Sequence, residues 1–207
     1  MQESNSPDKF ILVDCDGVCL DWEQAFYMWM LHKTIQPAVE NYKELYNVNE
    51  WYGLDKEQGK RLVTEFNASA AMGFLPPLRD SQWYIKMLAE KHGYRFVAVT
   101  SQSDDPFAQQ LRISNLKKLF GEDTFAEYHI LGCGDDKDEI LLELQDKYAG
   151  CYWIEDKPKN AIVGHNLGYR TMLVEHTHNM QMEIPEGIEV VRTWEDIYNS
   201  VIGIDKW

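Results

Sequence analysis

Apolar and amphipathic segments alternate along most of this chain. Residues 10–13 form a short, continuous apolar run, which is typical of a strand buried on both faces of a parallel sheet. Further apolar runs cover residues 94–100, 128–131, 151–155, 170–174 and 189–191. Segments with helical periodicity lie between or after them, at residues 81–92, 106–120, 138–148, 160–167 and 194–202. This alternation predicts an α/β fold with a Rossmann-like, mainly parallel sheet and helices on both faces.

One stretch interrupts the alternation. Between the first and second apolar runs, residues 20–35, 39–46 and 56–71 have helical patterns, and residues 47–54 are turn-like. Pro76 and Pro77 end the stretch. The pattern therefore predicts a core made of residues 1–19 and 76–207, and a small helical insert of residues 20–75.

The composition argues against two classes of partner. The chain has 207 residues, of which 44% are hydrophobic, and its net charge is −14. Such an acidic chain is a poor partner for a nucleic-acid polymer or an anionic membrane surface, because both are negatively charged. A small phosphorylated ligand remains compatible with this charge if a metal ion and a few local cations neutralise it.

The N-terminal residues and the cysteines predict a cytoplasmic protein. Residues 1–9 are polar and lack the apolar segment of a signal peptide, and no apolar run approaches the roughly 20 residues of a membrane span. Cys15, Cys19, Cys133 and Cys151 show no CxxC pairing, which favours free thiols in a reducing cytosol over a disulfide or a zinc site. The sequence leaves the oligomeric state open between a monomer and a homodimer.

Two carboxylates follow the first predicted strand. Asp14 and Asp16 are spaced i, i+2, so on extended backbone their side chains point to the same side, and Gly17 allows a sharp turn after them. Adjacent carboxylates repel each other unless a cation lies nearby, and oxygen ligands of this kind favour Mg²⁺. So short a motif is equally compatible with two aspartates that cap the next helix or lie in a solvated turn.

Three other strand ends or loops carry polar groups that could complete a site. Thr100 and Ser101 end the second strand, Lys137 follows the third, and Glu155 and Asp156 end the fourth. Taken singly, these are ordinary turn hydroxyls, a surface lysine and a helix N-cap pair. Taken together, they occur in order at one edge of a single predicted sheet, where α/β proteins bind their ligands. The combination favours the functional interpretation.

With these motifs the chain resembles the haloacid dehalogenase superfamily of phosphohydrolases over roughly residues 10–174. Residues 14–18 (Asp-Cys-Asp-Gly-Val) match the first motif of the superfamily, Thr100 the second, Lys137 the third, and residues 155–156 the fourth. The helical insert corresponds to a cap of the first (C1) type. Within the superfamily, the Asp-x-Asp-Gly-Val start and the segments Val-Thr-Ser and Ile-Glu-Asp-Lys-Pro are similar to the 5'(3')-deoxyribonucleotidase branch.

The resemblance implies a role for each motif residue. Asp14 would attack phosphorus and form an aspartyl-phosphate intermediate, and Asp16 would protonate the leaving oxygen and then activate water. Asp14, the backbone carbonyl of Asp16, and Asp156 would hold Mg²⁺. The groups that would bind the phosphoryl oxygens are Thr100, Ser101 and Lys137.

The fourth motif departs from the nucleotidase branch in one residue. Two aspartates are usual there, whereas this chain has Glu155 before Asp156. We expect Asp156 to be the direct metal ligand and Glu155 to orient the site from behind it. Lys157 and Lys159 are close in sequence and compete with Lys137 for the role of phosphate ligand.

The insert is expected to form a lid that excludes water and selects small substrates. Its aromatic side chains could stack on a base, and Trp22 and Phe26, nearest the hinge, are the expected pocket residues. Most of the other aromatic residues are expected in the core of the insert. His176 and His178 could touch a metal, but we expect them to be ordinary loop residues.

These features predict a Mg²⁺-dependent phosphomonoesterase for a small phosphorylated metabolite, with a nucleoside monophosphate as the leading substrate. A sugar phosphate or another metabolite is the alternative substrate. A non-catalytic member that binds a phosphorylated ligand or a protein is the alternative class. Asp14 and Asp16 count against a pure binder, which has no need of an acid/base carboxylate.

Overall fold

The structure, a computed structural model, describes residues 9–203; the predictions made for residues 1–8 and 204–207 lie outside this range. Its centre is a parallel sheet with the strand order β3-β2-β1-β4-β5-β6. The strands are β1 (Lys9–Val13), β2 (Tyr94–Ser101), β3 (Phe125–Leu131), β4 (Tyr152–Glu155), β5 (Arg170–Val174) and β6 (Glu189–Val191). The predicted α/β fold with its parallel sheet is confirmed.

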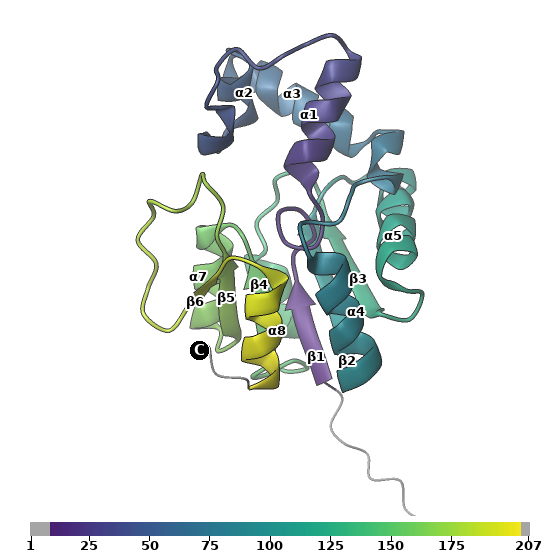
Figure 1. Cartoon of the computed structure of the whole chain (residues 1–207), viewed down its shortest axis with the longest axis vertical. Helices are drawn as coiled ribbons and strands as arrows, with labels where there is room; N and C mark the ends of the chain where they lie inside the picture. The colour runs from purple at the N-terminus through teal and green to yellow at the C-terminus, as the bar shows by residue number, and fades with distance from the viewer. Residues whose placement is uncertain (1–8, 204–207) are drawn as a thin grey trace, which may run out of the picture.

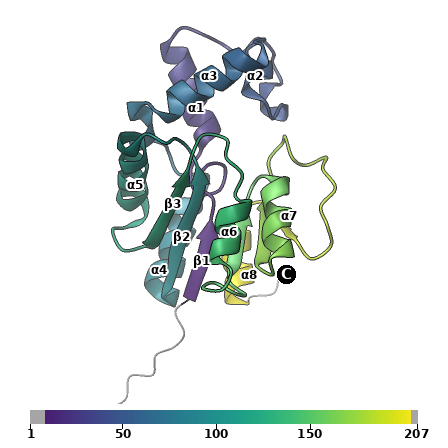
Figure 2. The same cartoon turned by 180° about the vertical axis from the view of Figure 1, so that it is seen from behind.

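Helices cover both faces of this sheet (Figures 1 and 2). The α-helices are α1 (Trp22–His32), α2 (Val48–Trp51), α3 (Lys56–Asn67), α4 (Ser81–His92), α5 (Pro106–Phe120), α6 (Asp138–Leu144), α7 (Pro158–Asn166) and α8 (Trp194–Ile202), and short 3₁₀ turns are η1 (Tyr42–Glu44) and η2 (Ala70–Gly73). Helices α4, α5 and α8 share one core with Ile11 and Val13 of β1, and α6 and α7 pack with Leu12 on the opposite face. Residues 11–13 of β1 are buried on both faces, which agrees with their continuous apolar run.

The helical insert lies beyond the carboxyl ends of the strands (Figure 1). Its own core consists of Phe26, Met30, Trp51 and Phe66, each at most 1% exposed. The two chain segments that join it to the sheet are paired: Asp21 N donates to Pro76 O at 2.9 Å, and Leu78 N donates to Cys19 O at 2.9 Å. The insert therefore enters and leaves at one place.

The prediction of a helix at residues 39–46 is wrong. Only the short turn η1 forms there, while α2 lies in residues 47–54, which were expected to be a turn. The side chain of Trp51, which is 1% exposed, donates its Nε1–H to Leu45 O at 2.7 Å, and Ala38 N donates to Trp51 O at 2.7 Å. Burial of one indole thus sets the local backbone and overrides the weak helical pattern.

No helix within residues 9–203 is long and apolar enough to cross a membrane. The cysteines are free thiols: Cys15 and Cys19 are buried, and Cys133 and Cys151 are partly exposed. This agrees with the prediction that the cysteines form no disulfide.

Candidate active site

Strands β1 and β4 bring the first and fourth motifs together at the carboxyl edge of the sheet. Val13 pairs with Ile154, and Asp14 N donates to Ile154 O at 2.9 Å. Carboxylate oxygens of Asp14, Glu155 and Asp156 lie within 4.8 Å of one another. A group of hard oxygen atoms at this spacing suits a divalent cation such as Mg²⁺, and the surroundings of each carboxylate decide which of them can be ligands.

Lys137 lies inside this acidic cluster. Its side chain is 2% exposed, and its Nζ is 2.6 Å from Asp14 Oδ2 and 2.8 Å from Glu155 Oε2. Burial lowers the pKa of Lys137, but the charges of Asp14 and Glu155 outweigh this, so the pKa lies above its ordinary value. The ammonium therefore stays charged next to Asp14, where it can also attract a phosphoryl oxygen.

Asp14 is a buried carboxylate with charged groups on several sides. It is 8% exposed, and its Oδ1 accepts the N–H of Cys15 at 2.6 Å. Burial raises the pKa of Asp14 to about 7; Lys137 opposes this shift, and Glu155 and Asp16 add to it. A carboxylate of raised basicity that faces a cavity is a suitable nucleophile once a cation holds it ionised.

Glu155 has both carboxylate oxygens occupied by donors of the protein. Oε1 accepts the backbone N–H groups of Asp156 and Lys157 at 2.9 and 3.0 Å, and Oε2 contacts Lys137 and the Asn160 amide at 2.8 and 3.1 Å. The side chain is fully buried. Burial raises the pKa of Glu155, but the charge of Lys137 and the hydrogen bonds to the carboxylate lower it by more, so the pKa lies below its ordinary value. This environment suits a residue that orients Lys137 and the Asp156 loop rather than a direct metal ligand.

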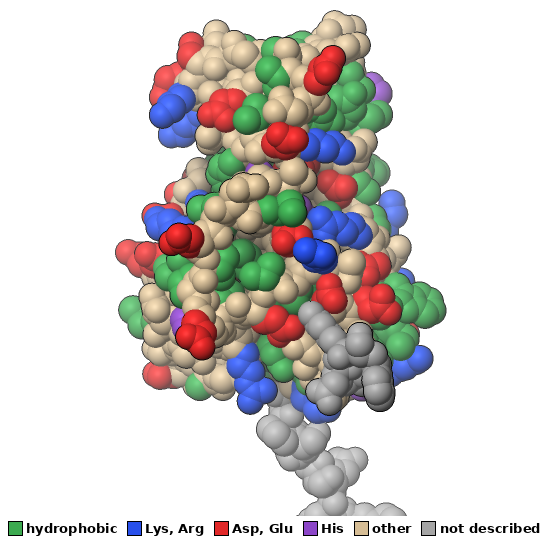
Figure 3. All heavy atoms as spheres, turned by 60° about the vertical axis from the view of Figure 1, so that its left-hand side comes forward, with side chains coloured by type: hydrophobic (Ala, Val, Ile, Leu, Met, Phe, Trp, Pro, Cys, Tyr) green, Lys and Arg blue, Asp and Glu red, His purple; other side chains and the backbone are tan. Residues whose placement is uncertain are grey.

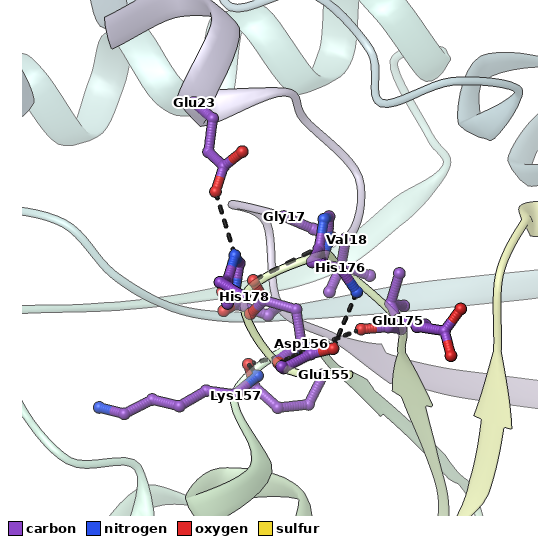
Figure 4. Close-up of polar contacts among 12 residues, drawn as sticks. Gly17, Val18, Glu23, Glu155, Asp156, Lys157, Glu175, His176 and His178 are labelled. Atoms are coloured by element: carbon purple, nitrogen blue, oxygen red, sulfur yellow. Dashed lines mark hydrogen bonds and ion pairs between the residues drawn. The ribbon is translucent and has the colours of Figure 1, made fainter. Parts of the chain in front are cut away.

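Asp156 faces Gly17 across the site. A Cβ placed on Gly17, whose φ is +72°, would lie 2.1 Å from Asp156 Oδ2, so only glycine allows this approach. His176 Nε2 is 2.7 Å from Gly17 O and 4.0 Å from Asp156 Oδ2 (Figure 4). Burial raises the pKa of Asp156 well above its ordinary value, and the charges of Glu155 and Asp14 add to this. The cluster carries more negative charge than Lys137 balances, which again fits a cation.

The second motif places its two hydroxyls differently. Ser101 lines the cavity next to the carboxylates and donates its hydroxyl to Asp135 O at 2.8 Å. Thr100 is fully buried and does not line the cavity, and its Oγ1 has no hydrogen-bond partner within residues 9–203. The structure thus brings Ser101, and not Thr100, to the cavity wall that a phosphate would meet.

A cavity of about 840 Å³ separates the insert from the sheet edge. Figure 3 shows the surface indented between these two parts. Its wall carries Asp14, Asp16 and Asp156 on the sheet side. The aromatic residues of the wall are Trp22, Tyr27, Tyr42, Tyr46 and Trp51. Phe26 is fully buried and absent from the wall, which corrects the expectation that it contacts the substrate: it packs in the core of the insert against Trp22 and Phe66.

The chain matches no family model. It is similar to an uncharacterised 32.4 kDa protein of the Gp30–rIII intergenic region of enterobacteria phage T4, at 29% identity over 200 residues, which cover 92% of this chain and 69% of that protein. Its structure is similar to that of the magnesium-bound HAD-hydrolase YfnB from Bacillus subtilis, at 15% identity and a TM-score of 0.62, covering 95% of this chain and 100% of the other. The chain has the haloacid dehalogenase-like fold.

A second solved structure with this haloacid dehalogenase-like fold is the D,D-heptose 1,7-bisphosphate phosphatase of B. bronchiseptica, in complex with magnesium and phosphate. Its identity to this chain is 14%, its TM-score is 0.56, and the match covers 94% of this chain and 98% of the other. At such low identity the likeness concerns the fold.

Sequence reasoning did not identify Arg112, the charged residue that contacts Asp16. It lies on α5, and both its terminal nitrogens contact the carboxylate of Asp16, at 2.6 and 3.2 Å. Arg112 belongs to none of the four motifs that carry the family resemblance. The only signal in the sequence is an arginine on the stripe of α5 that faces the core, spaced i+4 from Ala108 and i−4 from Leu116.

The other lysines and histidines considered from the sequence take different positions. Lys159 pairs with Asp136 on the surface at 2.7 Å, whereas Lys157 lines the cavity. His178 is stacked on His176, and its Nδ1 is 3.2 Å from Glu23 of α1, which joins the loop after β5 to the insert (Figure 4). The loop after β5 therefore contacts the insert.

Proposed function

We propose that this chain is a Mg²⁺-dependent phosphomonoesterase that uses Asp14 as nucleophile and its helical insert as a cap. The observation that carries the proposal is the contact of a buried aspartate with a buried lysine, 2.6 Å apart, beside Asp156 at the edge of a substrate-sized cavity. The solved phosphatase of the same fold, complexed with magnesium and phosphate, supports it.

The proposed reaction has two steps. Asp14 Oδ bonds to phosphorus while the bond from phosphorus to the substrate oxygen breaks, and Asp16 gives its proton to that oxygen. A water molecule then attacks the aspartyl phosphate, Asp16 takes a proton from it, and the bond from phosphorus to Asp14 breaks. Lys137 balances negative charge on the phosphoryl oxygens in both steps, with Ser101 at the same wall.

A magnesium ion would be held by Asp14, Asp156 and the backbone carbonyl of Asp16. When bound, it offsets the repulsion between the anionic nucleophile and the phosphate. Glu155 keeps Lys137 in place behind this site, because its Oε2 lies 2.8 Å from Lys137 Nζ.

The leading substrate class is a nucleoside monophosphate. Five aromatic residues line the cavity, and among them Tyr46 is 53% exposed, so a ring is available for stacking on a base. The resemblance of the first, second and fourth motifs to the 5'(3')-deoxyribonucleotidase branch favours the same class.

A sugar bisphosphate is the second candidate, and a different observation favours it. Lys43, Lys56, Lys60 and Lys157 line the cavity and form no ion pair within residues 9–203. On a chain with a net charge of −14, unpaired lysines at one cavity suit a ligand with a second anionic group. A phosphatase of similar fold acts on heptose 1,7-bisphosphate.

A phosphate-release screen tests the proposed function. Purified protein is incubated with nucleoside monophosphates, sugar monophosphates and sugar bisphosphates, with Mg²⁺ and with EDTA. We expect Mg²⁺-dependent release from at least one class. If none of these esters is hydrolysed in the presence of Mg²⁺, the chain is not a phosphomonoesterase, and binding of phosphorylated ligands becomes the better account.

Tyr46→Ala separates the two substrate classes. Loss of one stacking ring costs about 1–3 kcal/mol per base, so we expect KM for a nucleoside monophosphate to rise about tenfold. KM for ribose 5-phosphate should stay unchanged, because it has no base. Trp83→Ala on α4, whose ring is 65% exposed and away from the cavity, is the matched control. Equal changes for both substrates would argue against stacking.

The metal requirement predicts a pH dependence of stability. The pKa of Asp14 is raised from 3.8 to about 7 and that of Asp156 is also raised, so folding favours their protonated forms. Metal-free protein should therefore lose stability as the pH rises from about 4 to about 7. The lowered pKa of Glu155 acts in the opposite sense, but only below its ordinary value of 4.5.

Thermal unfolding midpoints with EDTA and with Mg²⁺, at pH 5 and pH 8, check this. We expect Mg²⁺ to raise the midpoint much more at pH 8, where the ligands are ionised. Asp156→Asn should remove most of the rise. A rise of equal size at both pH values would show that the ion binds elsewhere.

A further inference from the structure

Helix α5 carries an arginine on the side that faces the core. The buried residues of α5 include Ala108, Arg112 and Leu116, one per turn, and the side chain of Arg112 is 0% exposed. A guanidinium is costly to bury unless it is paired, so its partners define what the residue does.

Arg112 contacts both segments that join the insert to the core. Nη1 donates to Asp16 Oδ1 at 2.6 Å and Nη2 to Asp16 Oδ2 at 3.2 Å, while Nη2 also contacts Met72 Sδ at 3.3 Å. Asp16 lies on the outgoing segment, and Met72 on turn η2 of the returning one. One turn further along α5, the amide of Asn115 donates to Leu75 O at 2.9 Å.

Stability alone does not account for this arginine. A buried ion pair is often no more stable than apolar residues of similar volume, because desolvation offsets the attraction. The Nε of Arg112 also has no hydrogen-bond partner within the part of the chain that the structure describes. A methionine would fill the same space without either cost.

The pairing does restrict Asp16. The fork of a guanidinium binds both oxygens of a carboxylate in one plane, and this fixes the side-chain torsions of the aspartate. The carboxylate remains 22% exposed and lines the cavity, so its outer side stays accessible to a ligand. The shorter bond is to Oδ1, which leaves Oδ2 the less tightly held oxygen.

We propose that Arg112 is a positioning residue that aims the Asp16 carboxylate at the oxygen leaving phosphorus. This inference rests on the proposed function and adds a residue to it. Asp16 gives its proton to the substrate oxygen in the first step and takes one from water in the second, and both transfers need the carboxylate within hydrogen-bond reach. The same guanidinium contacts Met72 Sδ, so the orientation of Asp16 is coupled to the segment through which the insert returns to the core.

The test compares two leaving groups in kcat/KM, which reports on the first chemical step. When the bond from phosphorus to oxygen breaks, the alkoxide of an alkyl phosphate needs a proton from Asp16, whereas p-nitrophenyl phosphate releases p-nitrophenolate, which is stable as an anion. For Arg112→Met we expect kcat/KM to fall about 100-fold with the alkyl phosphate, a typical loss for a misplaced group. It should be nearly unchanged with p-nitrophenyl phosphate. A residue that only supports folding would lower both equally.

Three further comparisons serve as controls. Asn115→Ala removes the neighbouring contact of α5 with the returning hinge but leaves Asp16 untouched, and should not change the ratio of the two substrates. Arg112→Lys retains the charge without the fork, and should recover part of the loss. In the Asp16→Asn background, Arg112→Met should have no further effect, because its partner is already gone.

The outcomes are separable. If the unaltered protein hydrolyses neither these two esters nor any ester of the phosphate-release screen, the proposed function fails and Arg112 has no reaction to assist. If the unaltered protein is active but Arg112→Met lowers both substrates equally, or still acts in the Asp16→Asn background, the positioning role is refuted. Should Arg112→Met not fold, Arg112→Lys with the same pair of esters decides.

Discussion

Asp14→Asn should lower phosphate release by about 10⁴-fold or more while leaving the metal-free protein at least as stable as before. The loss of activity follows because an amide cannot form the aspartyl phosphate. The stability follows from burial: Asp14 is 8% exposed, and burial raises its pKa to about 7, so its ionised form is disfavoured in the folded chain. A neutral side chain of the same shape removes that cost.

Phosphate release with Mg²⁺ and the unfolding midpoint with EDTA at pH 8 measure the two effects. Asp136→Asn is the matched control, since Asp136 is exposed and pairs with Lys159 on the surface. It should change neither quantity appreciably. Residual activity of Asp14→Asn close to that of the unaltered protein would assign the nucleophile to another group.

Lys137→Met should damage both stability and activity. The lysine is enclosed by Asp14 and Glu155, and its removal leaves two buried carboxylates without a counter-charge. Breaking a buried pair in this way costs about 3–5 kcal/mol of unfolding free energy. Loss of a preorganised charge at the phosphoryl oxygens should lower kcat by about 10²–10³-fold.

Urea unfolding in EDTA at pH 7 and at pH 4 checks the electrostatic origin of this loss. The pKa of Glu155 lies below its ordinary value of 4.5, because Lys137 lowers it although burial raises it. The pair of Glu155 and Lys137 therefore stabilises the fold fully above pH 4.5, and this stabilisation is lost as the pH falls further. The destabilisation should therefore be largest at pH 7. Lys159→Met, at an exposed pair, should change the free energy of unfolding little. An equal cost for the two variants would contradict the buried-pair account.

Much of the core and of the candidate site can be predicted from sequence because the signals are local. The continuous apolar run before Asp14 identifies a strand buried on both faces, and parallel strands bring Asp14 and Asp156 to the same edge. Lys137 is a weaker case, because a lysine in a loop looks the same in sequence whether it is exposed or enclosed by carboxylates.

The remaining features depend on tertiary contacts that leave no local pattern. Arg112 is 96 positions from Asp16, and nothing in the helix around it marks its partner. Phe26 and Tyr46 are both aromatic residues of the insert, but packing buries the first and leaves the second at the cavity. Trp51 decides the backbone of residues 38–51 through its own burial, against the helical pattern.

The paired entry and exit of the insert make the molecule modular. Asp21 and Pro76 are joined by a backbone hydrogen bond of 2.9 Å, and Leu20 bridges Pro77, so 54 residues leave and return through a gap that a short loop could close. The strands and the carboxylates at their ends lie outside this span, and Met72, which contacts Arg112, is a part of the span that a replacement would have to keep. A different helical unit could be grafted there, and the selectivity of the protein exchanged without rebuilding its chemistry.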